Sequence, residues 1–464
     1  MQRHWKVLIV TAVAVFMSFL DVTIVNVAFP DVERDFPEAS RAGLSWILNG
    51  YNIVFAALLV PAGRLADLVG RRRMFLIGVT GFVAVSALCG LATSPELLVA
   101  ARFLQAAAGA ILVPTSLALL LPEFPVEKRA TAVAIWGATG AVAAALGPSL
   151  GGVLVEEAGW RWVFFLNVPI GLAALVPARR LLRESRHPAG VLPDALGTAL
   201  LVAGVGTLAL GIVQGPDWGW SSAGVLGSLA AAAVLLPAVV VRSARHRAPV
   251  IELDLFRARS FAVANAGMFA FSTAFYALLL GNVLFLTQIW GYSILEAGFA
   301  VTPGPLMAAV SAPVGGRLAD RFGQRVVALP GALLFAAGCA LFASGMGASP
   351  DYLGEYLVPT MLTGAGVGLS FAAWSSAAVA ELPATRFATG SAVLACLRQI
   401  GAVLGIAVLV AVLEGSPAAD PIAGFTDAWT LMAAAGGVVA LLALVLGRVG
   451  AAAPAPVAAA EASP

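Results

Sequence analysis

The chain has 464 residues, of which 60% are hydrophobic and only 11% are charged. A soluble globular domain carries about 25% charged residues, so the composition excludes a single soluble core and predicts an integral membrane protein. The net charge of +2 gives no reason to expect a nucleic-acid partner.

Apolar runs long enough to cross a bilayer, roughly 20 residues each, recur along the whole chain. The first run is too long for the apolar region of a cleaved signal peptide, and no small-residue cleavage site follows it, so we expect a retained helix. The hydropathy pattern predicts about fourteen spans. They cover 7–29, 44–63, 74–93, 97–120, 131–154, 162–182, 193–214, 222–241, 260–287, 297–315, 327–347, 353–376, 388–413 and 428–448.

The basic residues test this topology. If the N-terminus lies in the cytoplasm, most of the 27 Lys and Arg residues fall on the inner side, and only Arg34, Arg41 and Arg161 fall on the outer side. This excess is typical of a multi-pass protein of the plasma membrane, here with both termini cytoplasmic. Removing one early span would scramble the pattern, but removing the seventh and eighth together would not.

One loop sequence occurs twice. The pattern GRLADxxGxR begins at Gly63 after the second span and again at Gly316 after the tenth. Duplicated halves around a central site are a transporter architecture. We therefore expect an all-α membrane fold with two six-helix bundles related by pseudo-two-fold symmetry. The expected boundaries are 1–186 for the first bundle, 187–250 for two inserted helices, 251–450 for the second bundle and 451–464 for a disordered tail.

Asp21 is the one acidic residue deep inside a predicted span. An ionised carboxylate there costs several kcal/mol unless it is paired or hydrated. A carboxyl group that alternates between its protonated and ionised forms is what proton coupling needs, so Asp21 is the candidate coupling residue. The alternative is an Asp that only caps or hydrogen-bonds a neighbouring helix.

Arg102 is the candidate partner of Asp21. At 1.5 Å per residue, Arg102 lies roughly 8 Å and Asp21 roughly 12 Å from the outer ends of their spans, so the two can meet. Arg102 can then bias the protonation of the carboxyl group, or it can instead snorkel to the outer interface. Gln105, one turn along, is a polar partner on the same face.

The repeated loop is the candidate gate on the inner side. Gly63 and Gly70 permit sharp turns, while Asp67 can cap a neighbouring helix or pair with Arg71. The matching role in the second half falls to Asp320 and Arg321. The alternative is that the arginines only set topology. The gating-loop candidates are Gly63, Arg64, Asp67, Gly70, Arg71, Arg72, Asp320 and Arg321.

In the fifth span, Gly147, Pro148, Gly151 and Gly152 predict a kink and a close helix contact. Polar and aromatic residues in other spans are candidates for a wide apolar substrate cavity with a few polar anchors. For each aromatic residue alone, packing in a bundle or against lipid is an equal alternative. The cavity candidates are Asn26, Trp46, Asn49, Tyr51, Asn52, Gln105, Trp136, Asn265, Phe271, Tyr276, Asn282, Trp374 and Arg398.

Arg398 lies deep in the thirteenth span, with Gln399 beside it and no acidic residue at the same depth in the second half. It is a candidate for binding an anionic or polar substrate. The alternative is a structural pairing with backbone carbonyl groups.

Five motifs, in order, resemble the major facilitator superfamily, specifically its 14-helix drug:proton antiporter family. They cover nearly the whole chain and comprise Leu20–Pro30, Gly63–Arg73, Arg102–Gln105 with Gly109, Gly147–Gly152 and Trp160–Gly171. The resemblance implies proton coupling at Asp21 and marks the fifth-span motif as that of an antiporter. Some members carry a second acidic residue within the second half; this chain has none well inside a span, which puts a preference for multiply charged cations in doubt.

These features predict a secondary active transporter that exports lipophilic or cationic drugs or antibiotics in exchange for protons, by alternating access. The alternatives are a lipid or metabolite transporter or uniporter, and a non-coupled lipid-handling or sensory protein. Cys89, Cys339 and Cys396 lack metal-ligand spacing, and no phosphate-binding loop occurs. We therefore expect no enzyme activity, no metal and no cofactor besides the proton gradient. The expected partners are the substrate, protons and the bilayer, with the chain a monomer.

Overall fold

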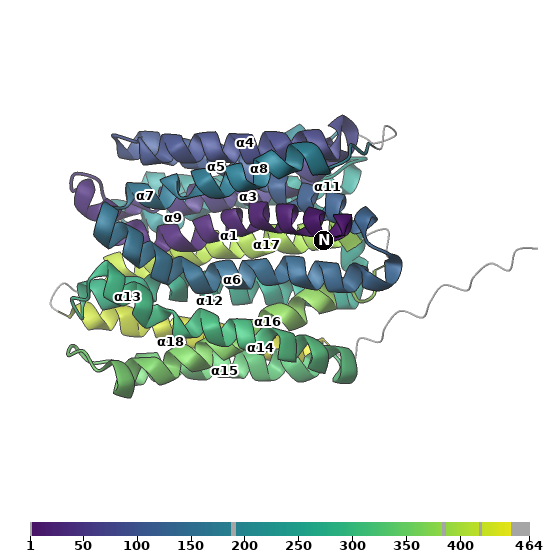
Figure 1. Ribbon diagram of the computed structural model, residues 1–464. Helices are drawn as coiled ribbons and strands as arrows, with labels where there is room; N and C mark the ends of the chain where they lie inside the picture. The colour runs from purple at the N-terminus through teal and green to yellow at the C-terminus, as the bar shows by residue number, and fades with distance from the viewer. Residues whose placement is uncertain (1, 187–191, 383–386, 417–419, 447–464) are drawn as a thin grey trace, which may run out of the picture.

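The computed structural model describes residues 2–186, 192–382, 387–416 and 420–446, and every regular element in those ranges is helical (Figure 1). The first half contains α1 (Arg3–Asp35), α2 (Arg41–Leu44), α3 (Trp46–Val69), α4 (Arg71–Gly90), α5 (Pro95–Leu120), η1 (Leu121–Glu123), α6 (Val126–Ala158), α7 (Arg161–Phe165) and α8 (Asn167–Leu181). Next come α9 (Ala195–Val213), α10 (Gly215–Trp218), α11 (Ala223–Arg245) and η2 (Leu253–Arg257). The second half contains α12 (Arg259–Gln288), α13 (Ile294–Val301), α14 (Pro303–Phe322), α15 (Arg325–Gly345), η3 (Tyr352–Tyr356), α16 (Leu357–Val379), α17 (Phe387–Glu414) and α18 (Pro421–Val445).

The predicted all-helical membrane fold is confirmed. Among the described residues, 13 helices are long and apolar enough to cross a membrane. The 33-residue helix α6 runs beside them in the bundle (Figure 1), which agrees with the expected count of about fourteen. The predicted disordered tail, 451–464, lies outside the described residues.

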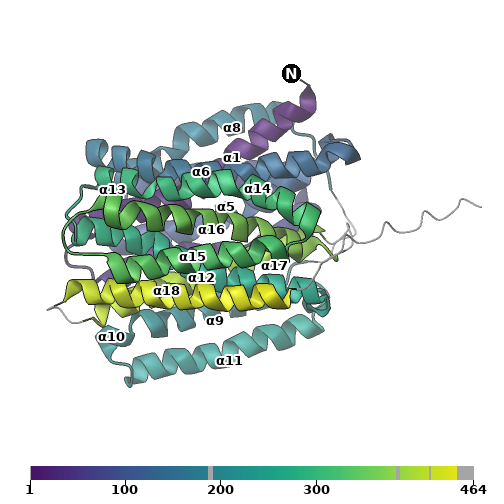
Figure 2. The ribbon, with the colours of Figure 1, turned by 90° about the horizontal axis from the view of Figure 1, so that it is seen from below.

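The helices lie side by side in two groups (Figures 1 and 2). In the first group α1 packs on α6, and α5 packs on α3 and α4; in the second, α12 packs on α17, and α16 packs on α14 and α15. The groups meet where α3 contacts α17 and where α6 contacts α13. Helices from both halves therefore border the central interface.

The two helices between the halves have different neighbours. Helix α9 packs on α3 and α17, so it lies where the two halves meet. Helix α11 packs on α9 and forms the periphery of the molecule (Figure 2). Its Val234 is 70% exposed, as expected for a side chain that faces lipid tails. The aromatic residues Trp218 and Trp220 of the connecting link are also exposed.

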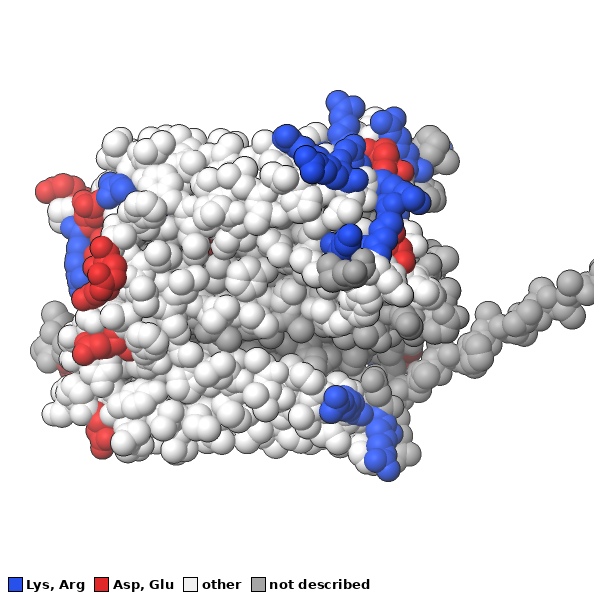
Figure 3. All heavy atoms as spheres, in the orientation of Figure 1, with Lys and Arg blue, Asp and Glu red and all other residues white. Residues whose placement is uncertain are grey.

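Charged side chains separate to the two ends of the bundle (Figure 3). On the face shown, Lys and Arg side chains gather at the end where α1 begins, which we call the basic end. Helix α1 ends at the opposite end, the acidic end, with Asp31, Glu33 and Asp35. The predicted outer arginines lie at the acidic end, where Arg41 pairs with Glu33 at 2.7 Å and Arg161 with Asp35 at 2.8 Å.

An ion pair at the basic end joins the two inserted helices. The buried side chain of Asp194 accepts hydrogen bonds from the backbone N–H of Gly197 at 2.8 Å and from Nε of Arg242 on α11 at 2.7 Å. Burial alone raises the pKa of Asp194, but the hydrogen bonds from Arg242 and Gly197 outweigh it and hold this pKa below its usual range. Asp194 therefore caps α9 and fastens α11 to it.

We expect Asp194→Asn to lower the free energy of unfolding by about 1–3 kcal/mol at neutral pH, because a charge-assisted hydrogen bond is lost. A carboxyl group with a lowered pKa stabilises the folded state above its ordinary pKa, and this stabilisation disappears as the pH falls through the lowered pKa. The difference in stability between the variant and the parent, measured by thermal unfolding in detergent, should therefore become smaller at acidic pH. The matched control is Asp254→Asn, whose side chain is 69% exposed. An equal loss in both variants would contradict the prediction.

Candidate functional site

A buried ion pair joins helices α1 and α5 inside the first half of the chain. Nη1 of Arg102 on α5 donates to Oδ2 of Asp21 on α1 at 2.5 Å, and the two side chains are 1% and 0% exposed. Nε of Arg102 donates to the carbonyl oxygen of Ile47 on α3 at 3.1 Å. Arg102 therefore turns into the bundle and does not snorkel to the surface.

Neutral amide groups complete the shell around the carboxylate. Nε2 of Gln105 and Nδ2 of Asn167, on α5 and α8, each donate to Oδ1 of Asp21 at 2.9 Å. Both amides also donate to the hydroxyl oxygen of Ser86 on α4, at 2.6 and 2.9 Å. Asp21 thus accepts one charged and two neutral hydrogen bonds, which can hold an ionised carboxylate inside an apolar bundle.

The guanidinium group of Arg102 is also covered by aromatic rings. It lies 4.1 Å from the centre of the Tyr51 ring on α3 and 5.7 Å from that of Phe164 on α7. Such rings stabilise a buried cation through their negative faces. All these partners belong to the first half, so in this structure the carboxyl group of Asp21 lies inside that bundle.

Two members of the shell, Ser86 and Asn167, were not among the predicted site residues. Small polar residues within spans are common, and sequence spacing alone did not show which faces of α4 and α8 turn toward α1. The signal that could have found them is that both lie in otherwise apolar stretches. Asn167 also falls within the Trp160–Gly171 motif, yet only the packing of α8 against α1 brings it to Asp21.

A second polar group crosses the interface between the halves. Nε2 of Gln399 on α17 donates to Oδ1 of Asn52 on α3 at 3.1 Å, and the hydroxyl of Tyr276 on α12 lies 3.4 Å from Oε1 of Gln399. The guanidinium of Arg398 lies 5.7 Å from the centre of the Phe19 ring on α1. Three predicted cavity residues, Asn52, Tyr276 and Arg398, therefore gather here, together with Phe19 and Gln399.

Other predicted cavity residues pack elsewhere. Phe271 and Trp374 are fully buried in the second bundle, and Asn282 there accepts a hydrogen bond from Trp429 at 3.1 Å. Trp46 packs in the apolar cluster between α3, α9 and α17. Trp136 donates to the hydroxyl of Ser116 at 3.0 Å, within the first half.

Three predicted amides are only half satisfied. The side-chain nitrogens of Asn26 and Asn265 donate to carbonyl groups of their own helices, and that of Asn49 to the hydroxyl of Ser45 at 3.4 Å. The side-chain oxygens of all three are buried without a hydrogen-bond partner. An unpaired buried oxygen is costly, so these positions have the capacity to accept a further donor.

The loop between α3 and α4 joins several helix ends at the basic end. Gly70 adopts φ +125° and ends α3, and Nε of Arg71 pairs with Asp67 at 2.7 Å. The carboxylate of Glu184 accepts the backbone N–H groups of Arg72 and Arg73, each at 3.1 Å, and so caps α4. Of the two predicted roles of Asp67, the structure has the ion pair, while Glu184 supplies the cap.

Further contacts extend this loop to other segments. Arg64 donates to Glu252 at 2.6 Å and to the carbonyl oxygen of Pro249 at 2.9 Å, and Gly63 lies against Pro114 on α5. In the second copy, Arg321 stacks on Phe322, and the position that corresponds to Arg71 is Gln324. The side chain of Asp320 lies outside the described part of the chain. The second copy therefore has Gln324 where the first has Arg71, the arginine that pairs with Asp67.

The predicted helix contact of the fifth-span motif occurs between α6 and α13. A Cβ atom at Gly152 would lie 2.9 Å from Cα of Leu295, and Gly298 approaches the carbonyl group of Pro148. Gly147 and Gly151 make similar room for α1. The hydroxyls of Ser149 and Thr302 lie 2.6 Å apart beside these glycines. This part of α6 joins the two halves near the acidic end.

The apolar side chains of α1 divide between two clusters, one toward each end of the helix. The half of α1 toward the acidic end, including Ile24 and Phe29, belongs to the large core cluster that contains most of the second bundle. The half toward the basic end, including Val7 and Met17, packs in a cluster almost wholly of the first bundle. Helix α1 is therefore packed against the second bundle toward the acidic end and against its own bundle toward the basic end.

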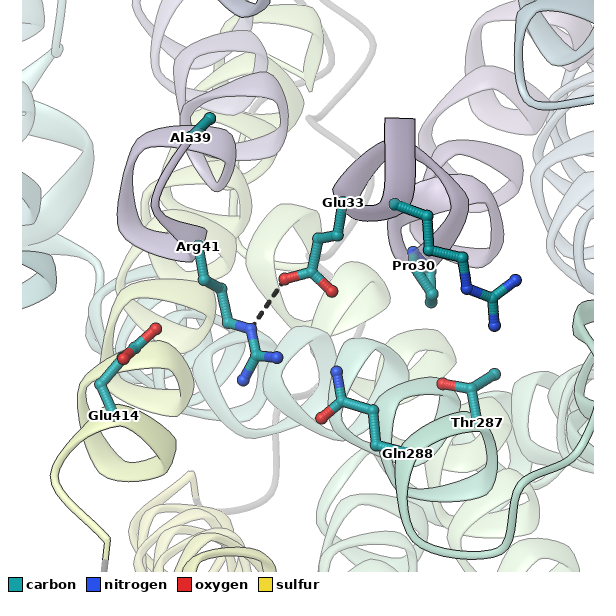
Figure 4. A pocket seen from close by; sticks show the side chains of 8 residues that line it. Pro30, Glu33, Ala39, Arg41, Thr287, Gln288 and Glu414 are labelled. Carbon is teal, nitrogen blue, oxygen red and sulfur yellow. Dashed lines mark hydrogen bonds and ion pairs between the residues drawn. The ribbon is translucent and has the colours of Figure 1, made fainter. Parts of the chain in front are cut away.

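A pocket of about 470 Å³ opens at the acidic end between the halves (Figure 4). The ion pair of Arg41 with Glu33 lines it, and Glu414 at the end of α17 approaches from the other half. It shares no lining residue with the Asp21 shell or with the predicted cavity set. This pocket lies at the acidic end of the interface between the halves, apart from the predicted site.

Comparisons with known proteins identify the family. The sequence model of the Major Facilitator Superfamily matches residues 11–279 and 264–463. The multidrug resistance protein Stp of Mycobacterium tuberculosis is 36% identical over 407 residues, which cover 88% of this chain and 75% of Stp. The probable actinorhodin transporter of Streptomyces coelicolor is 36% identical over 449 residues, which cover 94% of this chain and 77% of that protein.

The fold is also that of solved transporters. A crystal structure of the peptide transporter POT in complex with sulfate matches with a TM-score of 0.68 at 18% identity and covers 96% of each chain. At this identity the likeness concerns the fold alone. The family model and the relatives show more: the chain belongs to the Major Facilitator Superfamily, as a multi-pass membrane transporter of the drug-efflux type.

Proposed function

We propose that this transporter is a proton-coupled antiporter, which exports small lipophilic drugs or antibiotics from the cytoplasm while protons enter. The observation that carries the proposal is the buried pair of Asp21 and Arg102, surrounded by neutral donors in the middle of the first bundle. The relatives support the substrate class, because they are named as a multidrug resistance protein and a probable actinorhodin transporter. The proton gradient supplies the energy, without a cofactor.

The chemistry of the shell supports proton coupling. Ionised Asp21 is attracted to Arg102, whose guanidinium keeps its proton at any physiological pH. A proton that reaches Asp21 removes the charge and weakens this attraction. Arg102 is then left to its hydrogen bonds with Oε1 of Gln105 and the carbonyl oxygen of Ile47, and to the rings of Tyr51 and Phe164. Because the shell joins α1, α4, α5 and α8, the protonation of one carboxyl group can change how four helices pack.

Alternating access would follow from movement of the two bundles about the central interface. The close contact of α6 with α13 and the hydroxyl pair of Ser149 and Thr302 close the acidic end. We place the acidic end outside and the basic end, with the N-terminus, in the cytoplasm of a plasma-membrane protein, because basic residues concentrate on the cytoplasmic side. A ligand that binds one state better than the other then shifts the population between them.

The test is transport by the purified protein in liposomes with an imposed pH gradient. We expect uptake of a lipophilic dye such as ethidium into liposomes with an acidic interior, together with an efflux of protons that starts on addition of the dye. The uptake should stop when an ionophore collapses the gradient. Equal uptake with and without the gradient would contradict proton coupling.

A further inference from the structure

Arg398 carries an uncompensated charge near the centre of the second half. Its Nε atom is buried without a hydrogen-bond partner, and no acidic side chain pairs with it among the described residues. The neighbouring helix α12 contains no acidic residue, and α17 itself has only Glu414, at the far end. A charge inside a membrane protein is costly unless water or a counter-ion compensates it, so this cation is available to an anionic ligand.

Asp21, in contrast, is closed to ligands. Its carboxylate is 0% exposed and accepts hydrogen bonds from Arg102, Gln105 and Asn167. A cationic substrate would have to displace Arg102 to pair with it. Within the middle of the described spans, the charge that remains available to a ligand is therefore the positive charge of Arg398.

The surroundings of Arg398 resemble a binding site for an aromatic body. The Phe19 ring lies 5.7 Å from the guanidinium and reaches toward Gly140 on α6, so it stands between helices of both halves. Next to Arg398, Gln399 bridges to Asn52 across the interface and contacts Tyr276. The site combines a cation, amide groups and aromatic rings on four helices, at the interface that must open during transport.

We propose that Arg398 is the specificity determinant for lipophilic organic anions, in which a carboxylate, phenolate or sulfonate binds the guanidinium and the aromatic body packs against Phe19. This inference rests on the proposed transport function and names its substrate class. The planar guanidinium suits an oxyanion, because it can donate two parallel hydrogen bonds.

The charge balance of the cycle follows from this assignment. If one proton enters for each substrate that leaves, export of a monovalent anion moves two positive charges inward, a neutral substrate moves one, and a monovalent cation moves none. An inside-negative membrane potential should therefore accelerate export of an anion most. The potential provides a test that is independent of binding.

The binding test uses the whole protein in nanodiscs of neutral lipid, with anilinonaphthalene sulfonate as the anion and its sulfonamide as a neutral analogue. We expect Arg398→Gln to weaken binding of the sulfonate about tenfold or more, the size expected when one charged hydrogen-bonded contact is lost. Arg398→Lys should retain part of the affinity, and the sulfonamide should bind all variants alike. Arg257→Gln, whose side chain is 86% exposed, controls for the loss of one positive charge.

Two outcomes would overturn the inference: equal binding of the sulfonate to the parent and to Arg398→Gln, or an equal loss of the sulfonate and the sulfonamide in that variant. If ethidium moves with protons but the sulfonate is neither bound nor moved, only the anion assignment fails. If no probe moves in response to a pH gradient, while the sulfonate still binds through Arg398, the proposed antiport fails and the anion site remains.

Discussion

Replacing Asp21 with asparagine is expected to abolish the coupling of substrate transport to protons. The amide keeps the shape of the side chain and its bonding capacity toward Gln105 and Asn167, but it cannot exchange a proton. We expect pH-driven dye uptake to fall by at least about a hundredfold, to the rate of empty liposomes, because no other acid lies deep in the described spans. The measurement is the proton efflux that starts on addition of the dye.

This substitution also leaves Arg102 charged and unpaired inside the bundle. Removing one partner of a buried ion pair costs about 3–5 kcal/mol, so the single variant can lose activity through poor folding alone. The double variant Asp21→Asn with Arg102→Gln removes both charges and should recover most of the stability without recovering coupling. Asp254→Asn, at an exposed site, should behave like the parent. Proton-coupled uptake by a well-folded double variant would exclude Asp21 from the mechanism.

The site residues that could be predicted from the sequence were found by their charge or polarity and by their depth in a span. Asp21, Arg102 and Gln105 stand out in apolar runs, and the rise per residue along a helix places them at similar depths. Positive residues likewise predict the two ends of the bundle. These signals need no knowledge of how each helix is rotated about its axis, and for that reason they can be read from one sequence.

The rotation of a helix is what the sequence could not supply. Trp374 and Asn282 looked like cavity residues because they are aromatic or polar, yet in the structure they face neighbours within their own bundle. Ser86 and Asn167 are equally ordinary in sequence, yet they contact Asp21. In a helix that is apolar all round, periodicity does not distinguish the lipid face from the interface, so only packing can decide.

A side chain at Gly298 is expected to block closure of the acidic end. This glycine of α13 packs against α6, and a Cβ atom there would lie 3.2 Å from the carbonyl carbon of Pro148 and 3.3 Å from Cα of Gly152. These atoms belong to the backbone of a helix and cannot turn aside as a side chain does. Overpacking of about 1–3 kcal/mol would disfavour the closed state roughly 5- to 150-fold, so Gly298→Val should stop turnover.

The population shift can be measured apart from transport. A cysteine introduced by Ser149→Cys lies beside Thr302 in the closed contact, and the native cysteines Cys89, Cys339 and Cys396 are all buried. A membrane-impermeant maleimide added from the acidic end should label this cysteine slowly in the parent and faster in Gly298→Val.

The matched control is Gly437→Val on α18, where a Cβ atom would have no neighbour within 4 Å. In the Gly437→Val variant, the cysteine at position 149 should be labelled as slowly as in the parent. If Gly298→Val were labelled as slowly as the parent and still transported dye, the contact between α6 and α13 would not limit the cycle. A loss of transport without faster labelling would place the defect in folding rather than in closure, because the valine acts on the equilibrium only if the two helices must separate.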